Sequence, residues 1–292
     1  MDATSVFCDT KRRRPPFGGA EAVRLRHHPS SAPRRRKRRE RVMPRTLGLI
    51  GSGLIGTSLA RLAVAAGMEV VLSNSRGPES LAELVGTLGS GARAAVPEEA
   101  AEAGDLVVVT IPLRGYGRLP VAALRGRTVL DTMNYYPQRD GRIAELDAGR
   151  LTTSELVQRH LAGASVVKVF NNIGSHQLLS LARPAGAADR SALPLAGDEE
   201  PARREAARLL DVLGYDAVDM GPLAESWRSE PGTPVYTRPY LGETPPGLTA
   251  EEYFPWFLRN PGRPVPASLV RELTETAVRG PAGGVLPAGA AR

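Results

Sequence analysis

The stretch Thr46-Leu-Gly-Leu-Ile-Gly-Ser-Gly-Leu-Ile-Gly56 decides the fold of this chain. Its first five residues are mainly apolar and predict a short buried strand. The next six follow the pattern G-x-G-x-x-G, with glycines at Gly51, Gly53 and Gly56. In that pattern the first glycine permits a tight turn, the second lets a diphosphate approach the backbone, and the third lets a helix pack closely on the strand. The stretch therefore predicts the start of a dinucleotide-binding βαβ unit.

The residues that follow supply the context that the glycine pattern requires. Apolar side chains recur at helical spacing from Ile55 to Ala66, and Gly67 marks the end of that helix. A second apolar run, residues 69–72, predicts the next strand. The free N–H groups at the start of the helix, and its positive dipole end, favour an anion there. A glycine turn without a ligand is the alternative interpretation.

The end of the second predicted strand selects between dinucleotides. Proteins that bind NAD usually carry Asp or Glu there, about 20 residues past the glycines, to bind the ribose hydroxyls. This chain reads Ser73-Asn74-Ser75-Arg76, without a carboxylate. The guanidinium of Arg76 matches the geometry of a phosphate, and Ser75 adds a hydroxyl donor. The sequence therefore predicts NADP(H) rather than NAD(H), while an Arg76 that merely lies on a solvated loop is the alternative.

Strands and helices alternate through the rest of the body. The predicted strands comprise residues 105–111, 128–131, 165–170, 192–196 and 215–220. Helices are predicted over residues 81–88, over residues 154–161 with Ser154 as the cap, and over a segment that ends at Leu213. The apolar run 105–111 is typical of a parallel strand that is buried on both faces. Lys168 falls within a strand, and we expect it to point away from the packed face without a role. The pattern predicts an α/β fold, a Rossmann-type doubly wound parallel sheet.

A Pro-rich arm, residues 226–292, follows the predicted body at 43–225. Twelve of the 25 prolines lie between Pro222 and Pro287, which excludes long regular elements there. The arm also holds aromatic side chains, and residues 267–278 could form one short helix. We expect an extended arm that packs on the body or on a second subunit of a homodimer, with partial disorder as the alternative.

The basic character of the chain comes from its first 42 residues. They carry a net charge of +9, whereas the remainder carries −2. We expect residues 1–42 to be a disordered tail, because they lack apolar periodicity. Neither arginine run is followed by the apolar stretch of a secretory signal. A true start at Met43 and a nucleic-acid-binding tail both remain open, although the near-neutral body gives no reason to expect nucleic-acid binding.

Composition excludes several further classes of site. No run approaches the roughly 18 apolar residues of a membrane-spanning helix, so we expect a cytoplasmic protein without a membrane partner. Cys8 is the single cysteine, and the four histidines are not spaced as metal ligands. We therefore predict neither a disulfide framework nor a metal site. No catalytic triad or paired carboxylate stands out either, so no dedicated catalytic residue is predicted.

Several blocks of this sequence resemble a known family, the NADPH-dependent reductases of coenzyme F420, or deazaflavin NADP oxidoreductases. The blocks are GSGLIG, SNSRGPESL, TIP, DTMNYYPQRDGR, TTSELV, KVFNN and GDEE with LLDVLGYDAVDMGPL, within residues 45 to 225. The resemblance implies a small-molecule co-substrate and reversible hydride transfer between NADP(H) and the central carbon of the deazaflavin coenzyme F420. Such transfer between two stacked rings depends mainly on proximity and orientation, which agrees with the missing catalytic constellation.

The resemblance also assigns roles to individual residues. It implies that Ser52, Gly53, Leu54 and Ile55 hold the diphosphate, and that Ser75 with Arg76 holds the 2′-phosphate. It implies that Ile111 and Ser175 lie along the nicotinamide half. The weaker assignments to the deazaflavin pocket are Pro112, Asn172 and Ile173. His176 could donate a hydrogen bond or a proton to the reduced deazaflavin, or could be an exposed histidine without chemical use.

Three other functions remain open from sequence. GLIGTSLA also resembles the nucleotide motif of prephenate and 3-hydroxyacid dehydrogenases, which require a general acid or base and a long helical second domain. The prolines after residue 225 disfavour such a domain. A non-catalytic NADPH sensor would use the arm to bind a partner protein. A nucleic-acid-associated protein would act through the tail.

Overall fold

The structure, a computed structural model, describes residues 45–286, which belong to one compact unit. The predictions for the basic tail and for a start at Met43 lie outside these residues. The strands are β1 (Thr46–Ile50), β2 (Glu69–Ser73), β3 (Ala92–Ala94), β4 (Leu106–Val109), β5 (Thr128–Asp131), β6 (Ser165–Lys168), β7 (Ala192–Gly197) and β8 (Asp216–Asp219).

All eight strands form one sheet in the order β3-β2-β1-β4-β5-β6-β7-β8. Strands β1 to β6 are parallel, and the order reverses beside β1, where an open α/β sheet forms its ligand crevice. The predicted Rossmann-type fold class is thus confirmed. One feature differs from an all-parallel sheet: β7 pairs with β6 in the antiparallel sense, and β8 is parallel to β7. The amino ends of β7 and β8 therefore lie at the same edge as the carboxyl ends of β1 to β6.

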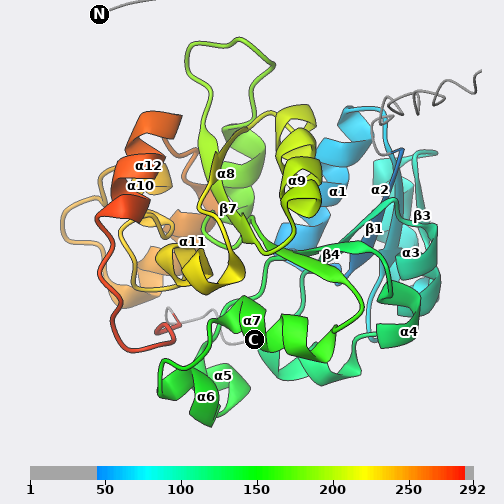
Figure 1. Ribbon diagram of the computed structural model, residues 1–292. Coiled ribbons are helices and arrows are strands. Elements are labelled where there is room, and N and C mark those ends of the chain that lie inside the picture. The colour runs from blue at the N-terminus through cyan, green and yellow to red at the C-terminus, as the bar shows by residue number, and fades with distance from the viewer. Residues whose placement is uncertain (1–44, 287–292) are drawn as a thin grey trace, which may run out of the picture. The chain divides into compact units, whose positions relative to one another are not determined.

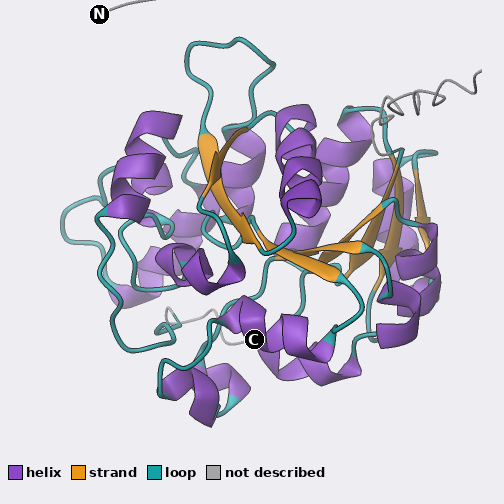
Figure 2. Ribbon diagram, viewed as in Figure 1, coloured by secondary structure: helices purple, strands orange, loops and turns teal. Residues whose placement is uncertain are grey.

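Helices cover both faces of this sheet (Figures 1 and 2). The α-helices are α1 (Leu54–Ala65), α2 (Ala82–Leu88), α3 (Pro97–Ala103), α4 (Val121–Leu124), α5 (Pro137–Asp140), α6 (Ala144–Asp147), α7 (Thr153–His160), α8 (Ser175–Ser180), α9 (Glu200–Val212), α10 (Arg238–Leu241), α11 (Ala250–Arg259) and α12 (Ala267–Glu275). The 3-10 helices are η1 (Pro78–Leu81), η2 (Leu113–Arg118) and η3 (Leu223–Ser229). None of the helices within residues 45–286 has the length and hydropathy that a bilayer crossing requires.

Strand β4 shows how the sheet separates two layers of core. Leu106 and Val108 belong to the layer beneath α1, α8 and α9, whereas Val107 and Val109 belong to the layer beneath α4 and α7. All four side chains are at most 2% exposed. Because successive strand residues point to opposite faces, only a strand covered on both sides can be apolar at every position. The unbroken apolar run that predicted this strand therefore has its physical cause in the double helix layer.

Two elements between residues 88 and 105 were not predicted. β3 has only three residues, Ala92–Ala94, and none of them is fully buried, so no apolar run in the sequence predicts this strand. α3 begins at Pro97 and is Ala-rich and Glu-rich, with only Ala100 and Ala101 buried. β3 lies at the edge of the sheet, whereas α3 packs closely on β1, where a Cβ on Gly48 would lie 2.2 Å from the Ala100 carbonyl oxygen. Neither element carries a run of large apolar side chains, so the sequence signal is weak.

The structure corrects the expectation for Lys168. Its side chain is fully buried, with Nζ 3.5 Å from Oδ2 of the equally buried Asp131, and Nζ donates to the carbonyl of Met133. Ser154 is also not the helix cap, because Thr152 caps α7 in a capping box with Glu155. The Ser154 hydroxyl instead donates to Oδ2 of Asp131 at 2.6 Å. A buried cation thus persists because a carboxylate and a carbonyl surround it.

The C-terminal arm is folded rather than extended. Within its described part lie α10, α11 and α12, and α12 corresponds to the helix predicted at 267–278. Figure 1 shows these helices together at the β7 side of the unit, away from α2 and α3. The arm packs on the body: the Ala192 amide donates to the Val265 carbonyl at 2.8 Å, and the Tyr240 hydroxyl donates to the Ala192 carbonyl at 2.8 Å. Both contacts lie at the amino end of β7, which shares its edge with the carboxyl ends of β1 to β6.

Candidate functional site

The glycine-rich loop between β1 and α1 has the geometry that its three glycines predict. Gly51 has φ of +113°, and a Cβ there would lie 2.2 Å from the carbonyl oxygen of Thr110. A Cβ on Gly56 would lie 2.4 Å from the Gly51 carbonyl oxygen, so this glycine lets α1 pack against the turn. A Cβ on Gly53 would meet nothing within 4 Å. Gly53 therefore leaves open space where the backbone can approach a ligand.

The first turn of α1 is available to an anion. Its N-cap is Gly53, which offers no side chain to cap the helix, and the first turn holds no acidic residue. The N–H groups of such a helix end lack internal partners and carry the positive end of the helix dipole. Leu54 at this end is 59% exposed, which is unusual for a leucine. The loop thus combines free donors with an open apolar surface.

A crevice of about 490 Å³ lies beside this loop at the carboxyl ends of β1, β2 and β4. Seven of the residues predicted for the cofactor or the deazaflavin line it: Gly51, Ser52, Gly53, Ser75, Arg76, Ile111 and Pro112. Its charged lining residues are Arg76, Arg114 and Arg118, and none of the residues lining it is acidic. An acid-free crevice with three guanidinium groups beside a helix N-terminus favours a ligand with several negative charges.

Asn74 connects the two sides of this crevice. Its amide nitrogen donates to the Ser52 hydroxyl at 3.3 Å and to the Ser80 hydroxyl at 2.9 Å, and its amide oxygen accepts from the backbone N–H of Arg76 at 2.8 Å. The neutral Asn74 side chain therefore fixes the loop that presents Ser75 and Arg76, both of which are exposed. The absence of a carboxylate at the tip of β2, predicted from the sequence, is a feature of the folded site.

Arg114 and Arg118 were not identified from the sequence. They lie in η2, which follows β4 and which no apolar pattern distinguishes from a loop. Arg114 is held in place because its guanidinium donates to the Arg139 carbonyl at 3.1 Å and its backbone N–H donates to Asp140 at 3.2 Å. A signal was available in the sequence, since both arginines follow directly on the strand whose end was predicted to bind ligand.

The remaining predicted residues do not line this crevice. Leu54, Ile55 and Gly56 belong to the first turn of α1, next to the lining residues. Ser175 begins α8, and its carbonyl accepts from the hydroxyl of Ser58 on α1 at 3.0 Å, so it lies beside the helix that the glycine loop opens.

The other two residues assigned to the deazaflavin, and His176, lie after β6. Asn172 and Ile173 are buried, and the Asn172 amide donates to the Tyr240 hydroxyl of the arm at 3.2 Å. His176 is half-buried on α8. These positions contribute to the packing between body and arm at the sheet edge that holds the crevice. Among residues 45–286, no group of His, Cys, Asp and Glu side chains is arranged to hold a metal ion.

A polar cluster lies at the carboxyl ends of β5 and β6. Asn134 and Asn171 bond to each other, with the Asn171 amide 3.1 Å from the Asn134 side-chain oxygen and the Asn134 amide 2.8 Å from the Asn171 carbonyl. The hydroxyls of Tyr136 and of Tyr236, from the arm, share a short hydrogen bond. The Asn134 amide is 3.4 Å from the Tyr236 hydroxyl. Asn134, Tyr136 and Tyr236 each keep part of their surface exposed.

Both phenols of this cluster stay protonated at neutral pH. Burial raises the pKa of the Tyr236 hydroxyl well above its usual value, and the neighbouring Tyr136 contributes to the same effect. Burial likewise raises the pKa of the Tyr136 hydroxyl, although the Tyr236 hydrogen bond and Arg139 partly oppose this. Arg139 lies 5.0 Å over the Tyr136 ring. The pair is therefore a source of hydrogen-bond donors rather than a base.

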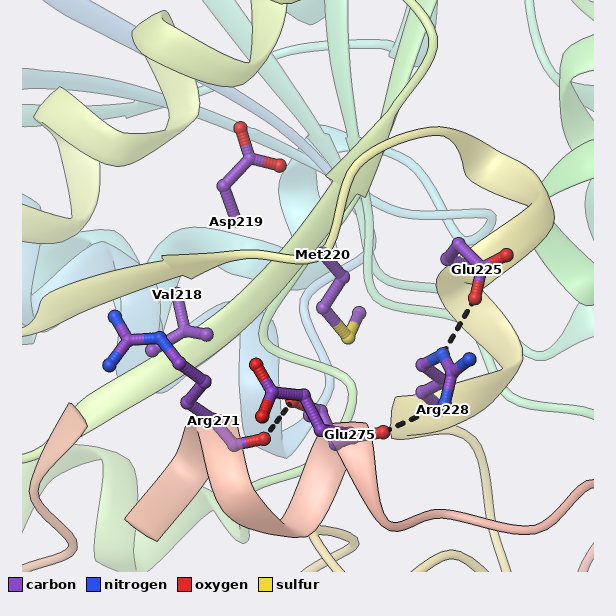
Figure 3. Close-up of a pocket in the computed structure, with 8 residues that line it drawn as sticks. Val218, Asp219, Met220, Glu225, Arg228, Arg271 and Glu275 are labelled. Carbon is purple, nitrogen blue, oxygen red and sulfur yellow. Dashed lines mark hydrogen bonds and ion pairs between the residues drawn. The ribbon is translucent and has the colours of Figure 1, made fainter. Parts of the chain in front are cut away.

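A second pocket, of about 410 Å³, lies between β8, η3 and α12 (Figure 3). Its charged groups largely compensate one another: Arg228 pairs with Glu225 at 2.6 Å, and Asp219 pairs with Arg203 at 2.9 Å. In Figure 3, Arg271 and Glu275 project from α12 into the same space. β8 is the last strand of the sheet, four strands away from β4, and no residue that lines this pocket also lines the crevice. This mixed-charge pocket is separate from the candidate site.

Solved structures of other proteins have folds similar to that of this chain. A hypothetical protein from Sinorhizobium meliloti is 30% identical, with a TM-score of 0.59 over 66% of this chain and 93% of that one. An Arthrobacter sp. FB24 protein, described as a "putative F420 dependent NADP-reductase", is 22% identical, with a TM-score of 0.53 over 63% of this chain and 87% of that one. The second similarity concerns the fold alone.

Sequence comparisons concern the part of the chain that holds the crevice. The Escherichia coli (strain K12) protein YjhV is 42% identical over 53 residues, which is 18% of this chain and 39% of that protein. The chain thus matches less than half the length of this curated relative. Residues 46–135 match the family described as "NADP oxidoreductase coenzyme F420-dependent", and every residue that lines the crevice falls within this range. The part of the chain that holds the crevice is therefore similar to this family of NADP oxidoreductases.

Proposed function

We propose that this protein transfers a hydride between NADP(H) and the deazaflavin coenzyme F420, with NADP(H) in the crevice beside the glycine loop. The single observation that carries the proposal is the crevice itself, an acid-free space with three arginines beside the first turn of α1. NADP(H) carries a diphosphate and a 2′-phosphate, and both require donors and positive charge.

The residues of the crevice divide between these two anionic groups. The backbone of Ser52 to Ile55 would hold the diphosphate, for which the open space at Gly53 leaves room. Ser75 and Arg76, exposed at the tip of β2, would hold the 2′-phosphate. A carboxylate at this position would repel that phosphate, and the chain has the neutral Asn74 there instead.

The acceptor is proposed on the family match and on the chemistry of the site. Nicotinamide and deazaflavin supply the reactive atoms when they are bound, so the chain has to orient two rings and exclude water. Neither lysine nor histidine lines the crevice, which disfavours a hydroxyacid dehydrogenase with a general base there. Ile111 and Pro112, at the exit of β4, offer an apolar edge for the nicotinamide half.

Absorbance spectroscopy tests this proposal directly. Purified protein is mixed with NADPH and oxidised F420, and the visible deazaflavin band is followed together with the NADPH absorbance. We expect both to fall in a one-to-one ratio, since one hydride and one proton reduce one deazaflavin. Binding of NADPH without any bleaching would contradict the proposed reaction and would favour a nucleotide sensor.

A further inference from the structure

The polar cluster around Tyr136 and Tyr236 lies on the half of the sheet where the reactive ring of a dinucleotide belongs. A doubly wound sheet binds one mononucleotide on each half, across the point where the strand order reverses. With Arg76 at β2, the adenosine half lies over β1 to β3, which leaves β4 to β6 for the nicotinamide half. Asn134 and Tyr136 follow β5, and Asn171 follows β6.

Direct contacts join this cluster to the crevice. The Thr132 N–H donates to the Val109 carbonyl at 3.1 Å, so the exits of β5 and β4 remain side by side. Arg114, which lines the crevice, donates its backbone N–H to Asp140, and the other oxygen of Asp140 accepts from the backbone N–H of Tyr136 at 2.9 Å. Tyr136 is thus separated from a crevice residue by a single carboxylate.

Backbone strain is concentrated at the same place. Among residues 45–286, only two non-glycine residues have positive φ: Phe170 at 62° and Thr237 at 50°. Phe170 directly precedes Asn171, and Thr237 directly follows Tyr236. Such conformations cost about 1–3 kcal/mol each and persist where surrounding contacts impose them. Both strained residues therefore flank the Asn171 and Tyr236 side chains of the cluster.

Further hydrogen bonds hold the arm against the body at this point. The Thr237 N–H donates to the Asn172 carbonyl at 2.9 Å, and the Asn172 amide donates to the Val235 carbonyl at 3.2 Å. The Asn171 amide donates to the Ser229 carbonyl at 2.7 Å. These contacts fix the position of Tyr236 relative to the exit of β6. The arm is therefore built to present one hydroxyl to Tyr136 rather than merely to cover apolar surface.

We propose that the Tyr136–Tyr236 hydroxyl pair donates a hydrogen bond and a proton to the acceptor that the nicotinamide hydride reduces. This inference rests on the proposed function and adds an acid to it. The hydride carries two electrons to a carbon of the acceptor, and the proton passes from the Tyr136 oxygen to the conjugated nitrogen or oxygen that gains negative charge. Tyr136 is the donor because its backbone is linked through Asp140 to the crevice, and Tyr236 of the arm returns a proton through the shared hydrogen bond, which solvent then restores.

The chemistry of the pair suits this role. A phenol that stays neutral at physiological pH can donate in every turnover, and a second phenol bonded to it stabilises the oxygen that has lost a proton. The Asn134 amide, 3.4 Å from the Tyr236 hydroxyl, helps to hold that hydroxyl in place. The acceptor class that fits is planar and conjugated, with a carbon that takes hydride and a nitrogen or oxygen that takes a proton. Oxidised deazaflavin has this chemistry.

Conservative Phe variants test the role of the hydroxyls. We expect Tyr136→Phe and Tyr236→Phe each to lower kcat for F420 reduction by about 10²-fold or more, the range for loss of a general acid. The dissociation constant for NADPH should stay unchanged. Tyr215→Phe is the matched control, because its hydroxyl is also buried and donates to the Leu178 carbonyl at 2.7 Å, away from the cluster. Thermal melting of all three variants separates loss of chemistry from loss of folding.

A binding experiment supplies a readout that does not depend on turnover. The chain contains 7 tyrosines, so labelling their Cζ atoms with carbon-13 gives a small set of NMR signals that single Phe variants assign. Addition of oxidised F420 to protein saturated with NADP⁺ should shift the signals of Tyr136 and Tyr236 and leave that of Tyr215 in place. Unshifted Tyr136 and Tyr236 signals would overturn the inference.

The kinetic outcomes distinguish the two proposals. If the wild-type protein reduces F420 and both Phe variants retain its kcat, as Tyr215→Phe does, the hydroxyl pair has no chemical role and the proposed function stands. If the wild-type protein binds NADPH but does not reduce F420, the proposed function fails, and the inference that rests on it fails as well. A fall in kcat that is confined to the Tyr136 and Tyr236 variants supports both.

Discussion

Replacing Arg76 by alanine tests the assignment of the crevice most directly. Arg76 lies at the tip of β2, is exposed, and lines the crevice beside Ser75. Its backbone N–H is held by Asn74, so the loop keeps its shape when the side chain is shortened. The substitution therefore removes one guanidinium group and leaves the glycine loop and α1 as they are. NADP(H) and NAD(H) differ only by the 2′-phosphate that this guanidinium would bind.

The expected effect follows from the strength of a charged hydrogen bond. Hydrogen bonds to charged groups contribute about 1.5–3 kcal/mol, and each 1.4 kcal/mol changes a dissociation constant about tenfold. Arg76 is exposed, so screening by water and salt places the effect near the lower limit. We expect Arg76→Ala to weaken binding of NADPH about tenfold and binding of NADH hardly at all, since NADH lacks the phosphate. The difference should shrink as ionic strength rises.

Titration calorimetry with both nucleotides, or the KM of each in the F420 assay, measures this difference. Arg61→Ala is the matched control, because Arg61 is an exposed arginine on α1 that does not line the crevice. It removes the same charge from the protein and should leave both affinities unchanged. Equal losses for NADPH and NADH in Arg76→Ala would refute the assignment of the 2′-phosphate to this residue. An equal loss of NADPH affinity in Arg61→Ala would show that the effect of Arg76→Ala comes from net charge alone.

Three further predictions concern the fold around the site. Gly51→Ala should lower the melting temperature, because its Cβ would lie 2.2 Å from a carbonyl oxygen, whereas Gly53→Ala should melt like the wild type and bind NADPH more weakly, because its Cβ would occupy open space. Lys168→Met should destabilise the protein by about 3–5 kcal/mol in denaturant unfolding, since it leaves a buried carboxylate without its cation; an unchanged stability would contradict this. Burial raises the pKa of the Tyr215 hydroxyl in the folded state. The neutral hydroxyl therefore stabilises the fold fully below the unfolded-state pKa of about 10, and this stabilisation is lost as the pH rises above that value. Denaturant unfolding at neutral and alkaline pH should therefore show a smaller alkaline loss of unfolding free energy in Tyr215→Phe than in the wild type.

Three of the strands that were predicted correctly share one physical property. β1, β4 and β5 are buried on both faces, so their sequences are apolar at successive positions and differ from any loop. β3 escaped prediction because its three residues, Ala92–Ala94, lie at an edge with partial exposure. The sequences of β7 and β8 also contain no local signal of the reversed direction of these strands. Strand direction depends on how the chain returns to the sheet, which residue patterns within a strand do not record.

The residues of the candidate site likewise fall into those that could be predicted from sequence and those that could not. The position of the glycine loop and of Arg76 at the crevice could be predicted because both are local: each position follows from one residue and its neighbours in sequence. Tyr136 and Tyr236 could not, since 100 residues separate them and only the packing of the arm brings their hydroxyls together. Lys168 was misjudged for a related reason, because its partner Asp131 lies on the neighbouring strand. Pairings of this kind require the tertiary structure.

The reversal of β7 explains how the arm can take part in the site. In an all-parallel sheet the amino end of β7 would lie at the edge opposite the crevice. Because β7 runs against β6 and pairs Ala196 with Lys168, β7 extends past the carboxyl end of β6 and its Ala192 end lies beyond it, on the crevice side. Hydrogen bonds from Ala192 to Val265 and from Tyr240 to Ala192 then attach the arm to this edge. A segment outside the matched family region is thereby anchored next to the half of the crevice where we place the nicotinamide, and Tyr236 lies between that anchor and β5. Loosening the anchor should therefore impair turnover before it impairs nucleotide binding, because the arginines and the glycine loop belong to the body alone.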